Sequence, residues 1–196
     1  LSSLTLIALF QLAVHGVEKR ISNAVSKIDS LLDAGYKKND VIPNPTINDS
    51  TFVRRGYLNI AGRIPTFKEA EAFVRSREKS KRSKLIDELL DSEGYVSHQF
   101  NWWADILRIN TRMNGQVASN GTAYANWVKS AIRENTPYDR FVRELITAQG
   151  MIEENGAVGF YLRDRGMELD HLATTVQVFL GTQLVCAQCH DHPFDD

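Results

Sequence analysis

The sequence has few cysteines and almost no net charge, and both scarcities restrict what the chain can be. Only two cysteines occur in 196 residues, which excludes a framework of several disulfides, so the fold must depend on its apolar core. The formal net charge is −1. The chain therefore lacks the basic field with which proteins hold a nucleic-acid backbone, and no nucleic-acid partner is expected.

Long apolar runs are also missing. The longest, Leu4–Val14, is interrupted by Thr5 and Gln11. It is shorter than the roughly 20 residues that a membrane-spanning helix needs, so no membrane span is expected. Its length suits the apolar part of a secretory signal, and Val14-His15-Gly16 is an acceptable cleavage site.

We therefore predict a partial signal peptide over residues 1–16 and a single helical domain over residues 17–196. The protein is then exported, to the periplasm or the cell surface. The alternative is an amphipathic first helix that runs on through Val17–Tyr36.

Catalytic residue patterns are scarce as well. We find no Ser-His-Asp spacing, phosphate-binding glycine loop or catalytic carboxylate pair above background. The sequence assigns no catalytic residue and leaves an enzymatic role open, as a redox component of a larger enzyme.

Apolar residues recur at helical spacing along most of the chain, and no alternating strand pattern persists. We predict an all-α fold, an irregular multi-helix bundle with short loops. Met113–Thr122 is expected to be a loop, and Val158–Leu162 a short extended piece. The expected helices cover about Val17–Tyr36, Thr51–Ala61, Lys81–Asp91, Tyr95–Asn110, Tyr124–Arg133, Tyr138–Ala148 and Glu168–Leu184, with one more opened by a capping box at Thr66–Glu69.

The two cysteines stand three apart and a histidine follows the second, in Cys186-Ala187-Gln188-Cys189-His190. This is the attachment motif of a c-type haem. Two intervening residues place both thiols on one side of a helical turn, at a span that matches the two vinyl groups of the porphyrin. His190 can then bind the iron as proximal ligand. Because bacteria attach haem outside the cytoplasm, this prediction of haem c agrees with the predicted export.

Other chemistry remains open for the same residues. Cys186, Cys189, His190 and His192 form a possible zinc or copper site. A disulfide between the two cysteines is a second alternative. A thioredoxin-like redox pair is a third, although that motif opens a helix after a strand, whereas here the motif follows a helix.

The distal iron ligand is not evident from the sequence. His192 is too close to His190 to reach the opposite face of the same haem. The first choice upstream is His98, which precedes the Trp102-Trp103 pair. The other candidates are His171, Met113, Met151 and Met167.

Two clusters of charged and aromatic residues have ambiguous roles. Trp102 and Trp103 are interpreted as aromatic core, flanked by an ion pair between Asp105 and Arg108. The charged triplet Arg163-Asp164-Arg165 precedes the last predicted helix and has no assigned role.

The segment Thr174–Gly181 with Cys186–Asp195 resembles a planctomycete cytochrome-like domain of unknown function, found in large secreted proteins. The resemblance covers about Ser26–Asp196. It implies an exported protein that often carries further domains, so we expect a chain truncated at its C-terminus, with downstream domains of the same polypeptide as partners. It implies no activity. Further matching segments are Phe52–Arg55, Gly62–Thr66, Trp103–Arg108, Asn135–Asp139 and Glu144–Ala148.

Two hypotheses follow from the sequence. The first is an exported c-type haem-binding module for electron transfer or redox chemistry within a larger secreted protein, with an unknown redox partner. The second is a helical structural or binding module that holds zinc or copper at the Cys/His motif.

Overall fold

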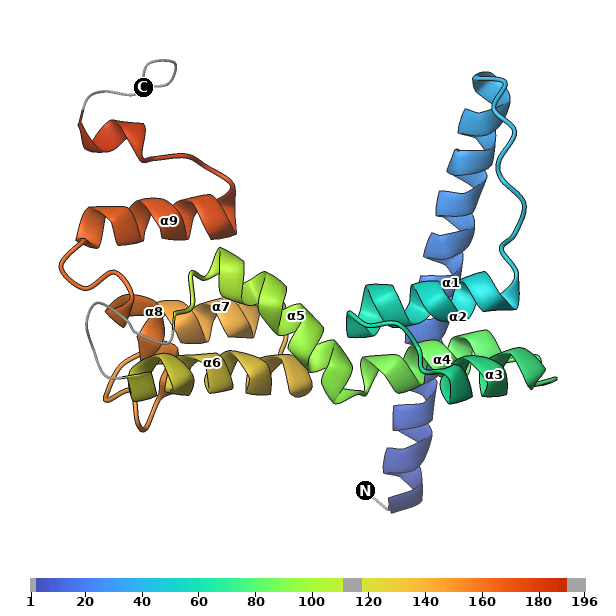
Figure 1. Cartoon of the computed structure of the whole chain (residues 1–196), viewed down its shortest axis with the longest axis horizontal. Helices are drawn as coiled ribbons and strands as arrows, with labels where there is room; N and C mark the ends of the chain where they lie inside the picture. Colours follow the sequence, from blue (N-terminus) through green and yellow to red (C-terminus); the bar gives the residue numbers. More distant parts are fainter. Residues whose placement is uncertain (1–2, 111–117, 190–196) are drawn as a thin grey trace. The chain divides into compact units, whose positions relative to one another are not determined.

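The computed structural model describes the backbone of residues 3–110 and 118–189, and the side chains of residues 19–110 and 121–189. Every regular element in these residues is a helix (Figure 1). This confirms the predicted all-α fold. Contacts divide the chain into two compact units, residues 1–47 and residues 48–196.

The first unit is built on one long helix, α1 (Ser3–Lys38). The helix runs through Gly16 without a break, and the cleavage predicted there stays a prediction. Beyond residue 18 it carries exposed apolar side chains, among them Ile21, Val25, Ile28 and Leu31. Among the described residues, no helix combines the length and the apolar character needed to cross a membrane.

The second unit begins with helix α2 (Asp49–Gly56), capped by Asn48, whose side chain accepts a hydrogen bond from the Thr51 amide at 2.9 Å. The helix continues as a π-helical segment, η1 (Tyr57–Ala61). Together they cover the predicted helix Thr51–Ala61. Gly62 ends it with φ of 67°, and a Cβ at Gly62 would lie 2.4 Å from Nδ1 of His98. Glycine suits this position because it adopts a positive φ readily and has no Cβ that would collide with His98.

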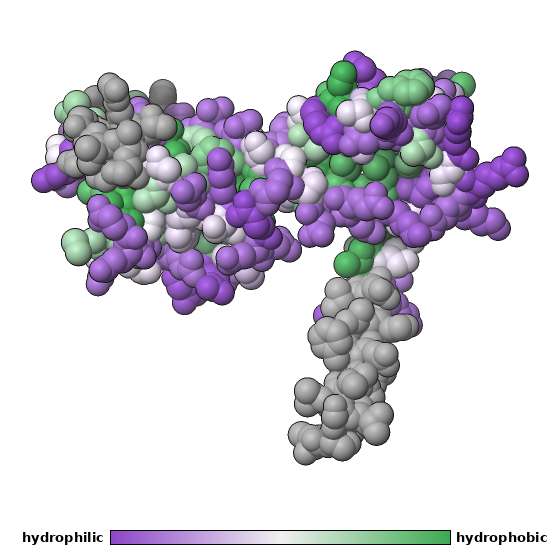
Figure 2. Space-filling view, turned by 60° about the horizontal axis from the view of Figure 1, so that its bottom comes forward, coloured by the Kyte–Doolittle hydropathy of each residue, from purple (hydrophilic) through white to green (hydrophobic). Residues whose placement is uncertain are grey.

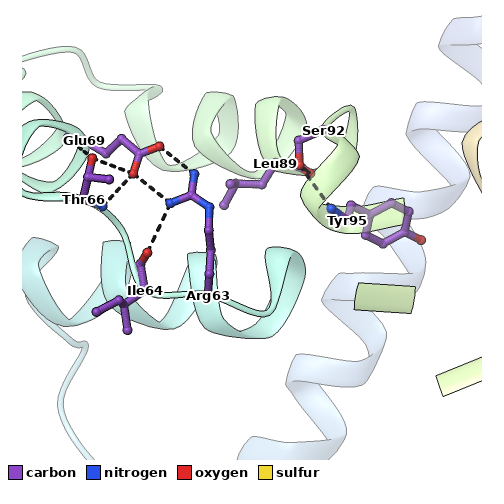
Figure 3. A network of polar contacts seen from close by, with 7 residues as sticks. All are labelled: Arg63, Ile64, Thr66, Glu69, Leu89, Ser92 and Tyr95. Atoms are coloured by element: carbon purple, nitrogen blue, oxygen red, sulfur yellow. Dashed lines mark hydrogen bonds and ion pairs between the residues drawn. The ribbon is translucent and has the colours of Figure 1, made fainter. Parts of the chain in front are cut away.

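Helices α3 (Phe67–Arg75) and α4 (Lys81–Leu90) complete the first half of this unit. The predicted capping box is present: Glu69 accepts a hydrogen bond from the Thr66 amide at 2.6 Å, and Thr66 accepts one from the Glu69 amide at 3.3 Å. Arg63 donates to the same carboxylate from Nη1 and Nη2 at 2.9 and 2.7 Å (Figure 3). The core between these helices consists of Val53, Tyr57, Ala61, Phe73, Leu85 and Leu89.

Helix α5 (Glu93–Ile106) links the first half to a second core. Its start is capped by Ser92, whose hydroxyl accepts a hydrogen bond from the Tyr95 amide at 3.2 Å (Figure 3). Helices α6 (Ala118–Arg133) and α7 (Tyr138–Ile146) follow. The second core consists of Leu107, Tyr124, Val128, Ala131, Phe141, Leu145, Ile152, Ala157 and Phe160.

Two predictions about local structure were wrong. Residues 118–122 belong to α6, although Met113–Thr122 was expected to be a loop; residues 113–117 lie outside the described part. Val158–Leu162 is not extended, because a 3-10 turn, η2 (Gly156–Val158), leads into the short helix α8 (Gly159–Leu162). Gly159 packs so closely on α6 that a Cβ there would lie 2.4 Å from Cβ of Tyr124.

The last described elements are helix α9 (Glu168–Leu180) and the 3-10 turn η3 (Cys186–Gln188). Helix α9 is shorter than predicted, because Gly181 ends it with φ of 71°. Figure 2 shows mostly hydrophilic side chains on the visible face, with apolar ones in small separate patches. This is the surface expected of a globular protein.

Candidate functional site

The cysteine motif forms a tight turn. In η3 the Cys189 amide donates a hydrogen bond to the carbonyl of Cys186 at 3.3 Å. Both thiols are free and exposed, so no disulfide joins them in this structure. The predicted ligands His190 and His192 lie outside the described residues.

The turn contacts helix α9 through a polar side chain. Gln188 donates from Nε2 to Oδ1 of Asp170, in the first turn of α9, at 3.4 Å. Gln188 thus attaches the turn that carries the thiols to α9. Contacts that hold α9 in place therefore also help to position the motif.

Uncovered apolar side chains precede the motif. The exposed fraction is 60% for Leu169, 53% for Leu172 and 74% for Leu180 on α9, and 54% for Val185 directly before Cys186. A porphyrin is a flat apolar ring. Contact between it and such side chains removes apolar surface from water, which is favourable. The two thiols and this apolar surface both fit a covalently attached haem.

A buried carboxylate fixes the other side of α9. The Asp164 side chain is 1% exposed, and its Oδ2 lies 3.2 Å from Nδ1 of His171 on α9. Its Oδ1 lies 3.3 Å from Nη1 of Arg108, at the end of α5. Arg108 also contacts Thr174 of α9 at 3.5 Å. The Asp164 carboxylate thus ties the end of α5 to α9.

Arg163 is the buried cation next to this carboxylate. It donates from Nη1 to the carbonyl of Leu107 at 2.7 Å and so satisfies the C-terminal end of α5. Its Nε forms an ion pair with Oδ2 of Asp164 at 2.9 Å, and Nη2 has no hydrogen-bond partner among the described residues. Burial lowers the pKa of Arg163, against the opposing effect of Asp164.

The backbone of Arg108 adopts a conformation that is rare for its residue type. Its φ is 54°, a left-handed value that usually belongs to glycine at a helix end. The Arg108 guanidinium pairs with Asp164. The expected ion pair between Asp105 and Arg108 was therefore wrong, because the side chain turns away from its own helix toward a carboxylate 56 positions later.

Trp102 and Trp103 have different environments. Trp103 packs against the second core, with its ring centroid 4.9 Å from that of Phe141. Trp102 is 57% exposed, so the interpretation as aromatic core holds for Trp103 alone.

The candidate distal ligands differ in their surroundings. His171 is oriented by Asp164, and the rings of Phe160 and Tyr161 lie 4.8 Å from its own. Burial lowers the pKa of His171 more than Asp164 raises it.

The remaining candidates are less constrained. His98 is partly buried and packs against Gly62 in the first half of the unit. Met151 and Met167 are 64% and 45% exposed, and Met113 lies outside the described residues.

Within the described residues, no group of three or more histidine, cysteine or acidic side chains is arranged to hold a metal ion. The predicted zinc or copper site includes His190 and His192, which lie outside that part, so it stays a prediction.

Sequence reasoning missed the role of Arg163 and Asp164. Adjacent charged residues usually mark a solvated loop, and their partners Arg108 and Leu107 are far away in the sequence. The only local signal was the aromatic pair Phe160-Tyr161, which only Leu162 separates from them.

One family of proteins matches most of this chain. Its sequence model, PSCyt2, is described as a protein of unknown function (DUF1549) and matches residues 27–196. Neither the curated proteins nor the solved structures contain a match.

Proposed function

The chain belongs to the PSCyt2 family of unknown function, and we propose that it is a c-type haem-binding module for electron transfer or redox chemistry within a larger exported protein. One observation carries the proposal: two free, exposed thiols share a tight turn that follows a helix with uncovered leucines. Because the function of this family is unknown, belonging to it indicates no activity. The proposal therefore depends on the chemistry of these residues.

Cys186 and Cys189 would hold the haem. Each thiol would join one vinyl group through a thioether bond, with the thiol hydrogen transferred to the neighbouring vinyl carbon. His190 would serve as proximal ligand. When bound, the haem supplies an iron that accepts and releases single electrons.

The network of Asp164 with Arg108, Arg163 and His171 (the Asp164 network) would keep the motif in place. Its contacts to His171 and Thr174 hold α9, and Gln188 attaches the motif to the same helix at Asp170. The Asp164 carboxylate at the centre of these contacts is buried, so its pairing with His171 is shielded from water, whereas Arg108 is about half exposed.

For the distal ligand, the contacts favour His171 over His98, the first choice from the sequence. Metal-binding histidines commonly bond their second ring nitrogen to a carboxylate. His171 Nδ1 already has such a partner in Asp164, which leaves Nε2 for a metal. Moreover, Asp170, the residue before His171, contacts the motif through Gln188.

Export belongs to the same proposal. The apolar run Leu4–Val14 suits a secretory signal, and attachment of haem outside the cytoplasm requires one. We expect the mature protein in the periplasm or at the cell surface, together with the downstream domains of its polypeptide and a redox partner.

A haem-stained denaturing gel tests the proposal. The chain is expressed with a functional export signal in bacteria that carry the haem-attachment machinery. Peroxidase staining is expected for the wild type and for Ala187→Ser, which changes the motif but keeps both thiols. It is expected to vanish in Cys186→Ala/Cys189→Ala. Exported protein without stain contradicts the proposal, and metal analysis of that sample then tests the zinc or copper alternative.

A further inference from the structure

A pocket away from the cysteine motif has the features of a ligand site. It has a volume of about 430 Å³ and lies between α5, the end of α6 and the start of α7. This volume is within the range of about 300–1,000 Å³ found for small-ligand sites. The proposed haem function makes no use of it.

Three aromatic residues that line the pocket lie close to one another. The Trp103 ring centroid lies 4.9 Å from that of Phe141 and 6.5 Å from that of Tyr138. The rings of Trp103 and Tyr138 are inclined by only 31°, and Tyr138 is 58% exposed. Aromatic rings of this kind offer apolar faces to a ligand.

The polar residues that line the pocket are uncharged. Gln99, Asn135 and Thr136 line it, and none of the residues lining this pocket is charged. These three side chains make no hydrogen bond within the described part of the chain. Their amide and hydroxyl groups remain available to a ligand.

The backbone that carries Asn135 and Thr136 has a defined conformation. Asn135 has φ of 48°, and the Thr136 amide donates a hydrogen bond to the carbonyl of Ala131 at 2.9 Å. This arrangement closes the C-terminal end of α6. The pocket therefore has a preformed wall, which reduces the entropy lost when a ligand binds.

We propose that this pocket binds a neutral sugar residue, as a single unit or within a polysaccharide. A pyranose has an apolar C–H face that stacks on an aromatic ring, and hydroxyl groups that both donate and accept hydrogen bonds. Amide and hydroxyl side chains match such groups, because they too both donate and accept. The absence of charged lining residues selects against acidic sugars.

A proline-rich peptide is the main competing ligand, since it also docks on aromatic surfaces. Its backbone offers mainly carbonyl acceptors. It would leave the amide oxygens of Gln99 and Asn135 without donors, and a sugar would not. The polar residues that line the pocket thus favour the sugar.

Isothermal titration of the purified full chain tests the inference. The probes are β-linked hexasaccharides of glucose, mannose and xylose, with an oligogalacturonate as acidic sugar and octaproline as peptide. We expect at least one neutral hexasaccharide to bind and the acidic sugar not to bind. Tyr138→Ala and Gln99→Ala are expected to weaken that binding at least tenfold. Neither residue belongs to the buried core, so both variants should fold.

Phe67→Ala is the matched control. Phe67 is an exposed aromatic residue too, at 78% against 58% for Tyr138, but does not line the pocket. Its substitution is expected to leave the affinity unchanged. The inference is overturned if no neutral hexasaccharide binds, if the control weakens binding as much as Tyr138→Ala, or if octaproline binds and the neutral sugars do not. These results do not depend on whether haem is attached.

Discussion

The carboxylate of Asp164 lies 3.2 Å from Nδ1 of His171, and the Asp164 side chain is only 1% exposed. A buried carboxylate thus orients an imidazole on the helix that leads to the cysteine motif. The stability of this part of the chain and its proposed chemistry both depend on the pair.

Stability should depend on the protonation of His171. Burial lowers the pKa of His171 from its ordinary value of 6.5, so the unfolded chain binds a proton at a higher pH than the folded chain. The contribution of His171 is therefore complete above about pH 6.5 and is lost as the pH falls through the folded pKa. Urea unfolding between pH 7 and pH 5 measures the effect. The decline should be smaller in His171→Asn, and an equal decline in both proteins would contradict the assignment.

Asp164→Asn should be strongly destabilising. The substitution leaves the buried guanidinium of Arg163 without its counter-ion, a change that typically costs about 3–5 kcal/mol. Denaturant unfolding at pH 7 measures the loss. The control is Glu144→Gln, which breaks an exposed pair with Arg140 and is expected to cause no measurable change. A similar small effect for both variants would show that the Asp164 network contributes little.

Gly159→Ala should destabilise the second core. A Cβ at this position would lie 2.4 Å from Cβ of Tyr124, and overpacking of this kind costs about 1–3 kcal/mol. Gly56→Ala is the control: its nearest neighbours are side-chain atoms 3.7 Å away in a helical backbone. That variant should gain about 0.5–1 kcal/mol. Equal stability of the two variants would mean that α8 and α6 can separate.

The haem-loaded chain should distinguish the two candidate distal histidines. If His171 completes the iron coordination, His171→Ala should change the visible spectrum from six-coordinate low spin to a high-spin form. His98→Ala should leave the spectrum unchanged, because His98 packs against Gly62. A spectral change in His98→Ala alone would identify His98 as the distal ligand. An unchanged spectrum in both variants would exclude both histidines as distal ligands.

Much of the helical fold follows from local sequence signals. The capping box at Thr66–Glu69 and the cap at Asn48 are set by residues three apart, so they can be recognised without knowledge of the fold. The cysteine motif is of the same kind, since its spacing alone indicates the chemistry.

The Asp164 network could not be predicted in this way. Arg108 pairs with a carboxylate 56 positions later, and its neighbour Leu107 accepts a hydrogen bond from Arg163 across the same separation. Helical periodicity contains no information about such pairs. The error at Val158–Leu162 has a related cause: glycine lowers helix propensity, yet Gly159 is needed for the close approach to α6.

The most direct test of the central claim is the intact mass of the exported protein after denaturation. The haem proposal predicts the mass of the polypeptide plus one haem, and the mass of the polypeptide alone for Cys186→Ala/Cys189→Ala. A wild-type protein that has passed through the haem-attachment machinery and still shows only the mass of its polypeptide would contradict the proposal.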